Sequence, residues 1–441
     1  MRRIDLLLHF RKVSERKECF YNFYCLFFLV KLFTCIFFLL FLSACGGGGG
    51  GSSPTETEST IITQPHSLET YNSKTFDLIA SSSSGASILF SIESNPSNGQ
   101  IIINGSQATY NPNNNYQGVD YFTVNASDGN FSESIPISVD VFENSYKDYS
   151  MSIESTLELG TYGDPNKEIK FTVNYQGVDR EFILIIPKSL NPYNKNSYPV
   201  VIHLHGNTQS AFSVYSNYSS YIKNAKDLNF YYVIPSGLSG VVGGGTDEEG
   251  TMTGWNAHFP GYNNEYDDSG FIKALINYLH DNHQITHKRI YLTGFSSGAH
   301  FAYTAANENT LIDGIQIFAG WMNKYNDWIF SQPIKAQHYH GTNDHVSYYE
   351  DSEHFGGQNS INEISSMKNC QGYDELVVDD FNGDGQKPTT IFSYSNCNDG
   401  SILQHFKIEG AEHISSTSLL YHDLSSSEQF YDFFELGSPI H

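Results

Sequence analysis

Positively charged residues are scarce in this 441-residue sequence, which has 24 Lys and Arg against 48 Asp and Glu and a net charge of −24. Nucleic-acid binding requires clustered Lys and Arg that neutralise phosphates, and a polybasic membrane anchor requires such a cluster beside anionic lipid. We therefore expect no nucleic-acid partner and no electrostatic attachment to a membrane.

Charged residues of both signs are also few, at 16% of the chain, whereas aromatic residues make up 15%. Disordered chains have the opposite composition. The 37 Gly and 14 Pro follow no tripeptide period, which excludes a collagen-like chain. At roughly 150 residues per domain, the length predicts two or three domains with enough chain to bury a core.

The N-terminal apolar run is short: it covers Leu32 to Leu42, which is 11 residues, whereas a bilayer-spanning helix needs about 20. Seven of the 24 basic residues lie in residues 1–44, and residues 45–441 carry 17 basic against 45 acidic residues. A basic start, a short apolar run and the small residues Ser43 and Ala44 predict an export signal over 1–44. The alternative is a transmembrane anchor, in which the apolar segment extends back past Lys31 to Leu26.

The sequence Leu42-Ser-Ala-Cys45 resembles the bacterial lipobox, whose cysteine is diacylated after cleavage. The resemblance implies that Cys45 anchors the mature protein to a membrane of the cell envelope. Gly46 stands where an aspartate favours retention in the inner membrane, so the outer membrane or the cell surface is the expected location. Residues 45–59 are rich in Gly and Ser and predict a flexible tether.

Cysteine is also scarce, with six residues in the whole chain. Three of them leave with the signal and Cys45 carries the lipid, so Cys370 and Cys397 remain. In an oxidising compartment we expect a disulfide across this 27-residue separation, which contributes about 3 kcal/mol to stability. The alternative is a pair of buried free thiols.

Residues 60–143 predict an all-β sandwich. Short alternating runs such as Asp120–Val124 and Ser134–Val141 are separated by turn clusters such as Asn95–Gly99. The segments Gly118–Val124 and Ser127–Gly129 resemble the cadherin-like or Ig-like repeats of bacterial surface proteins. The module contains no catalytic constellation, and its role as a spacer or as a binder of glycan or another surface stays open.

Residues 152–441 predict an α/β domain, because short apolar strands alternate with helices. The expected strands are Phe182–Ile186, Val200–Leu204, Phe230–Ile234, Ile290–Thr293, Gly314–Phe318 and Ile334–Tyr339. Apolar residues between Phe271 and Leu279 recur at helical spacing behind the start signal Asp267–Ser269, and a closing helix is expected around Phe430–Phe434. This alternation predicts a mostly parallel, doubly wound sheet.

The segment Gly294-Phe-Ser-Ser-Gly298 indicates a nucleophile. It follows the expected strand ending at Thr293 and precedes small residues that begin a helix, which is the context of the G-x-S-x-G nucleophile elbow. The tight turn raises the central serine hydroxyl above the sheet edge. We therefore predict Ser296 as the nucleophile, while Ser297 lies off the centre of the motif.

A serine nucleophile needs a histidine base and a carboxylate that orients the base, and in this fold they follow in the order acid, then histidine. Asp344 lies in the loop after the strand ending at Tyr339, where α/β sheets build their sites. His413 lies after the apolar run Leu403–Ile408. The rival histidines 338, 340 and 405 lie in or beside strands, where they have less freedom to reach the serine.

The developing oxyanion needs two backbone N–H donors. We expect one donor to be the backbone N–H of Ser297, the residue after the nucleophile. The other is expected from the loop after Val200–Leu204, where His205 and Gly206 shape the turn and Asn207 donates.

Together these segments resemble the secreted esterases of the poly(3-hydroxybutyrate) depolymerase and feruloyl esterase group. The resemblance rests on Pro199–Gly206, Arg289–Gly298, His340–Asp344 and Gly410–His413, in the family's order. It implies an α/β-hydrolase fold and hydrolysis of carboxylic esters with no required cofactor, on a polymeric or polysaccharide-linked substrate. Feruloyl, acetyl and short polyester substrates are all compatible. The alternatives are a serine peptidase on the same fold and a non-catalytic surface-binding protein.

One polar segment departs from that family, from Ile361 to Ser401. It contains Asp380, Asn382 and Asp384 at alternate positions before Gly385, which is how a calcium loop begins. The twelfth position, which should be a carboxylate, is Ile391. The segment therefore predicts either a structural calcium site or an ordinary hairpin turn.

Overall fold

The computed structural model describes residues 60–142, 148–159, 167–190, 198–239, 253–258, 265–283, 285–350, 355–378, 388–415 and 426–436. The expected signal, the lipid-bearing Cys45, the tether, and the candidate calcium ligands Asp380, Asn382 and Asp384 lie outside these residues. Within them, no helix is long and apolar enough to cross a bilayer.

The N-terminal domain is all-β. One sheet has the order β2-β9-β8-β5, a second has the order β3-β7-β6, and β1 pairs with β4. Its strands are β1 (Ile61–Thr63), β2 (His66–Thr70), β3 (Lys74–Asp77), β4 (Ala80–Ser82), β5 (Leu89–Ser94), β6 (Gly99–Asn104), β7 (Gln107–Pro112), β8 (Gly118–Ser127) and β9 (Ser132–Val141). Alternate residues such as Val124 and Ala126 on β8 are fully buried, so this domain has a hydrophobic core of its own.

The α/β domain is built on one 11-stranded sheet with the order β10-β11-β12-β14-β13-β17-β18-β19-β22-β21-β20. The strands are β10 (Ser152–Glu158), β11 (Glu168–Tyr175), β12 (Val178–Ile185), β13 (Tyr198–Leu204), β14 (Tyr231–Pro235), β17 (Ile285–Phe295), β18 (Gly314–Phe318), β19 (Lys335–Gly341), β20 (Tyr373–Val378), β21 (Thr389–Tyr394) and β22 (Ile402–Ile408). A separate short pair joins β15 (Leu238–Ser239) to β16 (Thr253–Gly254).

The expected parallel arrangement forms the centre of this sheet. The strands from β14 across to β22 pair in parallel. Antiparallel strands extend the sheet on both sides, with β10, β11 and β12 at one end and β21 and β20 at the other. Within the polar segment that departs from the resembled family, β21 and β20 therefore form one edge of the sheet.

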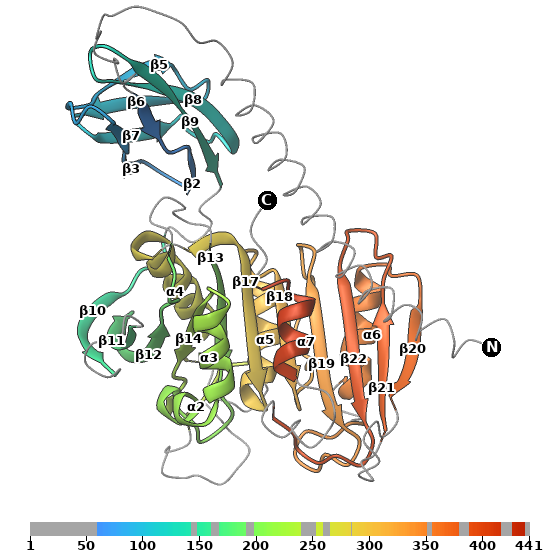
Figure 1. Ribbon diagram of the computed structural model, residues 1–441. Coiled ribbons are helices and arrows are strands. Elements are labelled where there is room, and N and C mark those ends of the chain that lie inside the picture. Colours follow the sequence, from blue (N-terminus) through green and yellow to red (C-terminus); the bar gives the residue numbers. More distant parts are fainter. Residues whose placement is uncertain are drawn as a thin grey trace, which may run out of the picture. The chain divides into compact units, whose positions relative to one another are not determined.

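Helices cover both faces of the sheet, as Figure 1 shows. They are α2 (Ala211–Asn217), α3 (Ser219–Asp227), α4 (Asp268–Asn282), α5 (Ser297–Glu308), α6 (Gly357–Met367) and α7 (Ser426–Phe433). Residues of α4, α5 and α6 belong to one core cluster, whereas residues of α2, α3 and α7 belong to another. The sheet is therefore doubly wound, as the alternation of strands and helices predicted.

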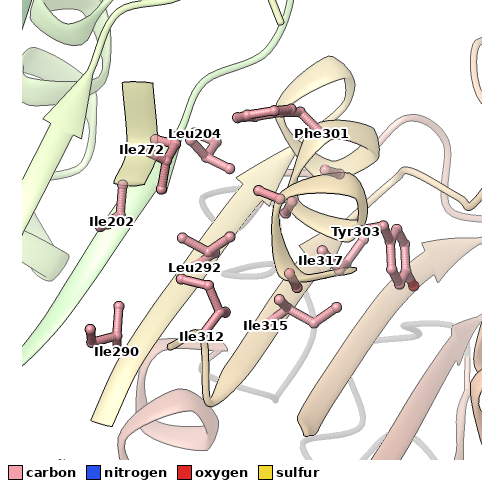
Figure 2. Close-up of a cluster of buried hydrophobic side chains, with 14 of the residues drawn as sticks. Ile202, Leu204, Ile272, Ile290, Leu292, Phe301, Tyr303, Ile312, Ile315 and Ile317 are labelled. Atoms are coloured by element: carbon pink, nitrogen blue, oxygen red, sulfur yellow. The ribbon is translucent and has the colours of Figure 1, made fainter. Parts of the chain in front are cut away.

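The alternation of side chains along a strand explains why two cores form. On β13, Val200, Ile202 and Leu204 belong to the cluster beneath α4 and α5, while Val201 belongs to the opposite cluster. Figure 2 shows Ile202, Leu292 and Ile317 of three neighbouring strands in the cluster that also contains Phe301 of α5. Because helices cover both faces of the sheet, the central strands are apolar on both sides. They therefore form continuous apolar runs that could be recognised in the sequence.

The expected disulfide is present between Cys370 and Cys397. Cys370 follows α6, and Cys397 lies between β21 and β22. The disulfide therefore links the end of α6 to the antiparallel edge of the sheet.

Candidate active site

The site begins at the turn between β17 and α5. Ser296 has φ 54° and ψ −119°, a left-handed conformation that costs roughly 1–3 kcal/mol for a residue with a side chain. Its N–H donates to Phe318 O at 3.0 Å, and the N–H groups of Ala299 and His300 donate to its carbonyl. These bonds hold the strained residue in place at the start of α5.

Two glycines make this turn sterically possible. A Cβ on Gly294 would lie 2.4 Å from Gly298 O, and a Cβ on Gly298 would lie 2.2 Å from Leu204 O. Such separations are far below van der Waals contact. The glycine on each side of Ser296 is therefore required by the close approach of strand, turn and helix.

The structure brings Ser296, His413 and Asp344 together from three separate loops. His413 Nε2 lies 3.0 Å from Ser296 Oγ, and His413 Nδ1 lies 2.8 Å from Asp344 Oδ2. An ionised carboxylate only accepts hydrogen bonds, so Nδ1 carries the proton. In a neutral ring Nε2 is then free to accept the serine proton.

Asp344 is buried and held in its charged form. Burial alone raises the pKa of its carboxyl, but hydrogen bonds from His340, His413 and the Val346 N–H outweigh burial and hold the pKa well below its usual range. The N–H groups of Val346 and Ser347 donate to Asp344 Oδ1 at 2.8 and 2.9 Å. The carboxylate is therefore fixed in position and ionised at neutral pH.

Backbone contacts fasten the acid loop to the histidine loop. Thr342 N donates to Ile408 O at 3.0 Å, and Asn343 N donates to Ala411 O at 2.9 Å. A Cβ on Gly341 would lie 2.2 Å from Ala411 O, so glycine is needed where the two loops meet. This pairing positions Asp344 beside His413 although they are 69 residues apart.

A second histidine also contacts the acid. His340, fully buried on β19, places Nε2 2.7 Å from Ser347 O and 3.4 Å from Asp344 Oδ2. Both partners are acceptors, so Nε2 carries the proton. Sequence reasoning set His340 aside because it lies in a strand, and only the curl of the following loop brings it to Asp344.

The hydrogen bonds continue behind His340. Its Nδ1 lies 3.1 Å from His338 Nε2, and His338 Nδ1 lies 3.1 Å from Tyr303 Oη. Burial lowers the pKa of His338 well below its ordinary value, so the ring is neutral. Tyr303, His338, His340 and Asp344 therefore form one continuous series of polar contacts.

On the other side of Ser296 lies the loop after β13. His205 is buried, and burial lowers its pKa to about 4. Its Nδ1 donates to Gly206 O at 2.8 Å, and its Nε2 accepts from Gly237 N at 2.8 Å. His205 therefore shapes the loop that presents Asn207, as the sequence predicted for it.

Asn207 and Ser297 both line the cavity onto which Ser296 opens. This arrangement is compatible with the oxyanion role predicted for their N–H groups. The cavity has a volume of about 150 Å³, and the described residues that line it are Asn207, Trp255, Ala257, Ser296, Ser297, His300, Trp321, Val346 and Ser347.

The sequence analysis did not identify six of these lining residues as site residues: Trp255, Ala257, His300, Trp321, Val346 and Ser347. His300 lies one helical turn after Ser296 on α5, and Trp321 follows the carboxyl end of β18. Their positions after strand ends and near the elbow were the available signals.

A buried ion pair supports the loop that carries Trp255. Arg180 Nη1 of β12 lies 2.6 Å from Asp268 Oδ1 at the start of α4, with both side chains almost completely buried. Asp268 Oδ2 accepts from Asn256 N at 2.6 Å, and Trp255 Nε1 donates to His205 O at 2.9 Å. The loop is therefore tied both to α4 and to the loop that carries Asn207.

Comparison with known families follows this division into two domains. Residues 54–142 match the family model described as a bacterial Ig domain. Residues 189–359 match the family model described as phospholipase/carboxylesterase. The C-terminal domain has the α/β-hydrolase fold. The N-terminal domain is Ig-like.

This α/β-hydrolase chain is also similar to a curated protein, a bifunctional acetylxylan esterase/xylanase from Neocallimastix patriciarum. The two are 26% identical over 267 residues, which cover 60% of this chain and 35% of that protein. The chain thus spans about a third of the length of the relative.

Two solved structures are also similar to the chain. An S-formylglutathione hydrolase from Agrobacterium tumefaciens aligns with a TM-score of 0.41 at 14% identity, over 65% of this chain and 100% of that one. A ferulic acid esterase from Anaeromyces mucronatus aligns with a TM-score of 0.38 at 18% identity, over 62% of this chain and 90% of that one.

Proposed function

We propose that this protein is a serine hydrolase of carboxylic esters, exported and held at the cell envelope through a lipid on Cys45. The observation that carries the proposal is the hydrogen-bonded series Ser296–His413–Asp344 at the strained turn after β17. The match of residues 189–359 to the phospholipase/carboxylesterase family supports an ester as the substrate. The acetylxylan esterase relative supports an ester linked to a polysaccharide.

The reaction proceeds in two halves. Ser296 Oγ attacks the ester carbonyl carbon while His413 Nε2 takes its proton, and the carbonyl oxygen becomes an oxyanion facing the N–H groups of Asn207 and Ser297. The intermediate collapses, His413 returns the proton to the leaving alcohol, and an acyl group remains on Ser296. Water then attacks the acyl group with His413 as base, which releases the carboxylic acid and restores the serine.

Asp344 keeps His413 in the required tautomer and stabilises the charge that forms on the ring. No cofactor takes part in these steps, and a calcium ion at Asp380, Asn382 and Asp384 would have a structural role only. The Ig-like domain acts as a spacer or a binder of the surface that carries the ester.

The deciding experiment is the variant Ser296→Ala, assayed with 4-nitrophenyl acetate. We expect kcat to fall by about three or more orders of magnitude, because the nucleophile is lost while the fold is kept. Ser297→Ala is the matched control, because it removes the neighbouring hydroxyl and keeps the backbone N–H. A Ser296→Ala enzyme with nearly full activity would remove Ser296 from the role. Turnover of a nitroanilide in place of the ester would favour a peptidase.

A further inference from the structure

The cavity beside Ser296 lies on one side of the reacting atoms. His413 protonates the leaving alcohol in the proposed reaction, so the alcohol must lie on the His413 side of the serine. His413 is not among the described residues that line the cavity, whereas Asn207 and Ser297 are. The cavity is therefore placed to receive the acyl part of the ester, next to the oxyanion donors.

The volume of the cavity is small for many acyl groups. About 150 Å³ is the size of an engineered protein cavity that holds one benzene molecule. An acetyl group fits such a space easily. A feruloyl group combines a ring of that size with a propenoyl linker, a methoxy group and a hydroxyl, and so exceeds it.

Two indole rings form rigid walls of this cavity. Trp255 stacks on Phe301 with ring centroids 5.2 Å apart and an interplanar angle of 2°, and its Nε1 is bonded to His205 O. The rings of Trp321 and His300 pack with centroids 4.3 Å apart, and the backbone O and N of Trp321 lie 2.9 and 3.0 Å from His300 Nδ1. Enlarging the cavity therefore means breaking packed contacts rather than turning a free side chain.

The remaining lining is largely polar. Asn207 Oδ1 and Ser297 Oγ are buried atoms that have no hydrogen-bond partner among the described residues. A long alkyl or aromatic acyl chain laid along this polar lining would leave each polar group that it covers without a hydrogen bond, at a cost of about 1–3 kcal/mol for each.

We propose that the cavity lined by Trp255 and Trp321 is an acyl site that restricts the enzyme to short acyl groups, with acetyl as the preferred group. This inference rests on the proposed function and narrows its substrate class to acetyl esters. Trp321 is the specificity-determining residue, because it forms a wall without holding the oxyanion loop as Trp255 does.

The test compares the acetate, butyrate, octanoate and ferulate esters of 4-nitrophenol, which share one leaving group. Each kcat/KM is divided by the rate of the same ester in buffer, which removes differences in intrinsic reactivity. We expect acetate to exceed octanoate and ferulate by about tenfold or more. In Trp321→Ala the ferulate-to-acetate ratio should rise about tenfold.

Trp328→Ala is the matched control, because it removes an indole that stacks on Phe330 and does not line the cavity. The ratio should stay unchanged in that variant. If Trp321→Ala does not fold, Trp321→Phe keeps a buried ring, enlarges the cavity less and should raise the ratio less.

Wild-type turnover of ferulate equal to that of acetate would overturn the size restriction and leave the esterase proposal standing. An unchanged ratio in the Trp321 variants would also overturn it. Hydrolysis of none of these esters would overturn both proposals together.

Discussion

His340 shows how a buried residue can control the ionisation of Asp344 without lining the cavity beside Ser296. Its Nε2–H is directed at Ser347 O and at Asp344 Oδ2, and its bond helps to hold the pKa of Asp344 low. The groups that face Asp344 are His340, His413 and the N–H groups of Val346 and Ser347.

We predict that His340→Phe raises the pKa of Asp344 and shifts the acid limb of the pH–rate profile to higher pH. With one donor fewer, the Asp344 carboxylate stabilises a proton on His413 Nε2 more strongly, so the base is blocked by protonation at a higher pH than in the wild type. Loss of a hydrogen bond to a charged group should also lower the free energy of unfolding by about 1.5–3 kcal/mol. The pH–rate profile is recorded with 4-nitrophenyl acetate as the substrate, from acid to mildly alkaline solution.

The matched control is His345→Phe, which replaces an exposed histidine of the same loop. Its profile should coincide with that of the wild type. A His340→Phe profile that is lower at every pH but unshifted would mean that His340 only supports the fold.

Asp313, between β17 and β18, contributes a pH dependence to stability. Its carboxylate accepts from Ile290 N at 2.9 Å, but burial is the larger effect and raises its pKa to about 6, although His287 and Lys335 act to lower it. An acid whose folded pKa is raised stabilises the fold below its unfolded pKa of about 3.9. That stabilisation is lost as the pH rises through about 6.

We predict that Asp313→Asn removes this loss, because the amide oxygen still accepts from Ile290 N and carries no charge. Relative to the variant, the wild type should lose about 3 kcal/mol of unfolding free energy between about pH 4 and pH 7. Denaturant unfolding of both proteins across this range measures the difference. The control is Asp327→Asn, which changes an exposed aspartate. If the unfolding free energies of the wild type and of Asp313→Asn change with pH in the same way, the prediction is contradicted.

At the scale of elements, the centre of the sheet could be predicted and its edges could not. The apolar runs that form β13, β14, β17, β18 and β19 are buried on both faces and therefore stand out in the sequence. β10 is exposed along its whole length and β20 along most of it, so neither carries an alternating apolar signal. These strands are defined by backbone pairing with a neighbour, which composition does not reveal.

The residues of the candidate site also fall into two groups, those that the sequence predicted and those that it did not. Ser296, Asp344 and His413 follow strands in the order that one fold imposes, so their positions in the chain indicated their proximity. Trp255, Trp321 and His340 reach the same region only through the curl of loops. Their contacts depend on three-dimensional packing, for which no spacing rule was available.

The disulfide belongs to the scale of elements because it ties the end of α6 to the edge hairpin. β21 pairs with β22, and β22 ends at Ile408, whose carbonyl holds the acid loop through Thr342 N. We predict that reduction, or the double variant Cys370→Ser/Cys397→Ser, lowers the free energy of unfolding by about 3 kcal/mol and lowers activity with it. Thermal melts and rates with and without reductant measure both effects. Unchanged melting and unchanged rate in reductant would refute this coupling.

A calcium ion at Asp380, Asn382 and Asp384 would add a smaller stabilisation, of the size that mass action gives for one weak site. Melts in chelator and in added calcium measure this effect separately from the disulfide. A melting temperature that is the same in both solutions would assign residues 380–384 to an ordinary turn.

At the scale of the whole molecule, charge determines how the protein can be attached to a membrane. Residues 45–441 carry 17 basic and 45 acidic residues, so anionic lipid repels this part of the chain. Any attachment to a membrane would then have to come from apolar groups, and a single acyl chain gives only marginal binding. A lipid on Cys45, followed by a Gly- and Ser-rich tether, would meet this requirement and leave the enzyme free to reach an extended substrate.

We therefore predict that Cys45→Ser moves the protein from the membrane fraction to the soluble fraction, whereas Cys35→Ser leaves it membrane-bound. The Cys35 variant is the matched control because it changes a cysteine of the apolar run that the cleaved protein loses. High salt should not release the wild type, because the attachment is not electrostatic. Quantitative immunoblots of the fractions, together with esterase activity in each, measure the outcome. If Cys45→Ser stays with the membrane, the segment from Leu26 to Leu42 acts as an uncleaved transmembrane helix and the lipid proposal is wrong.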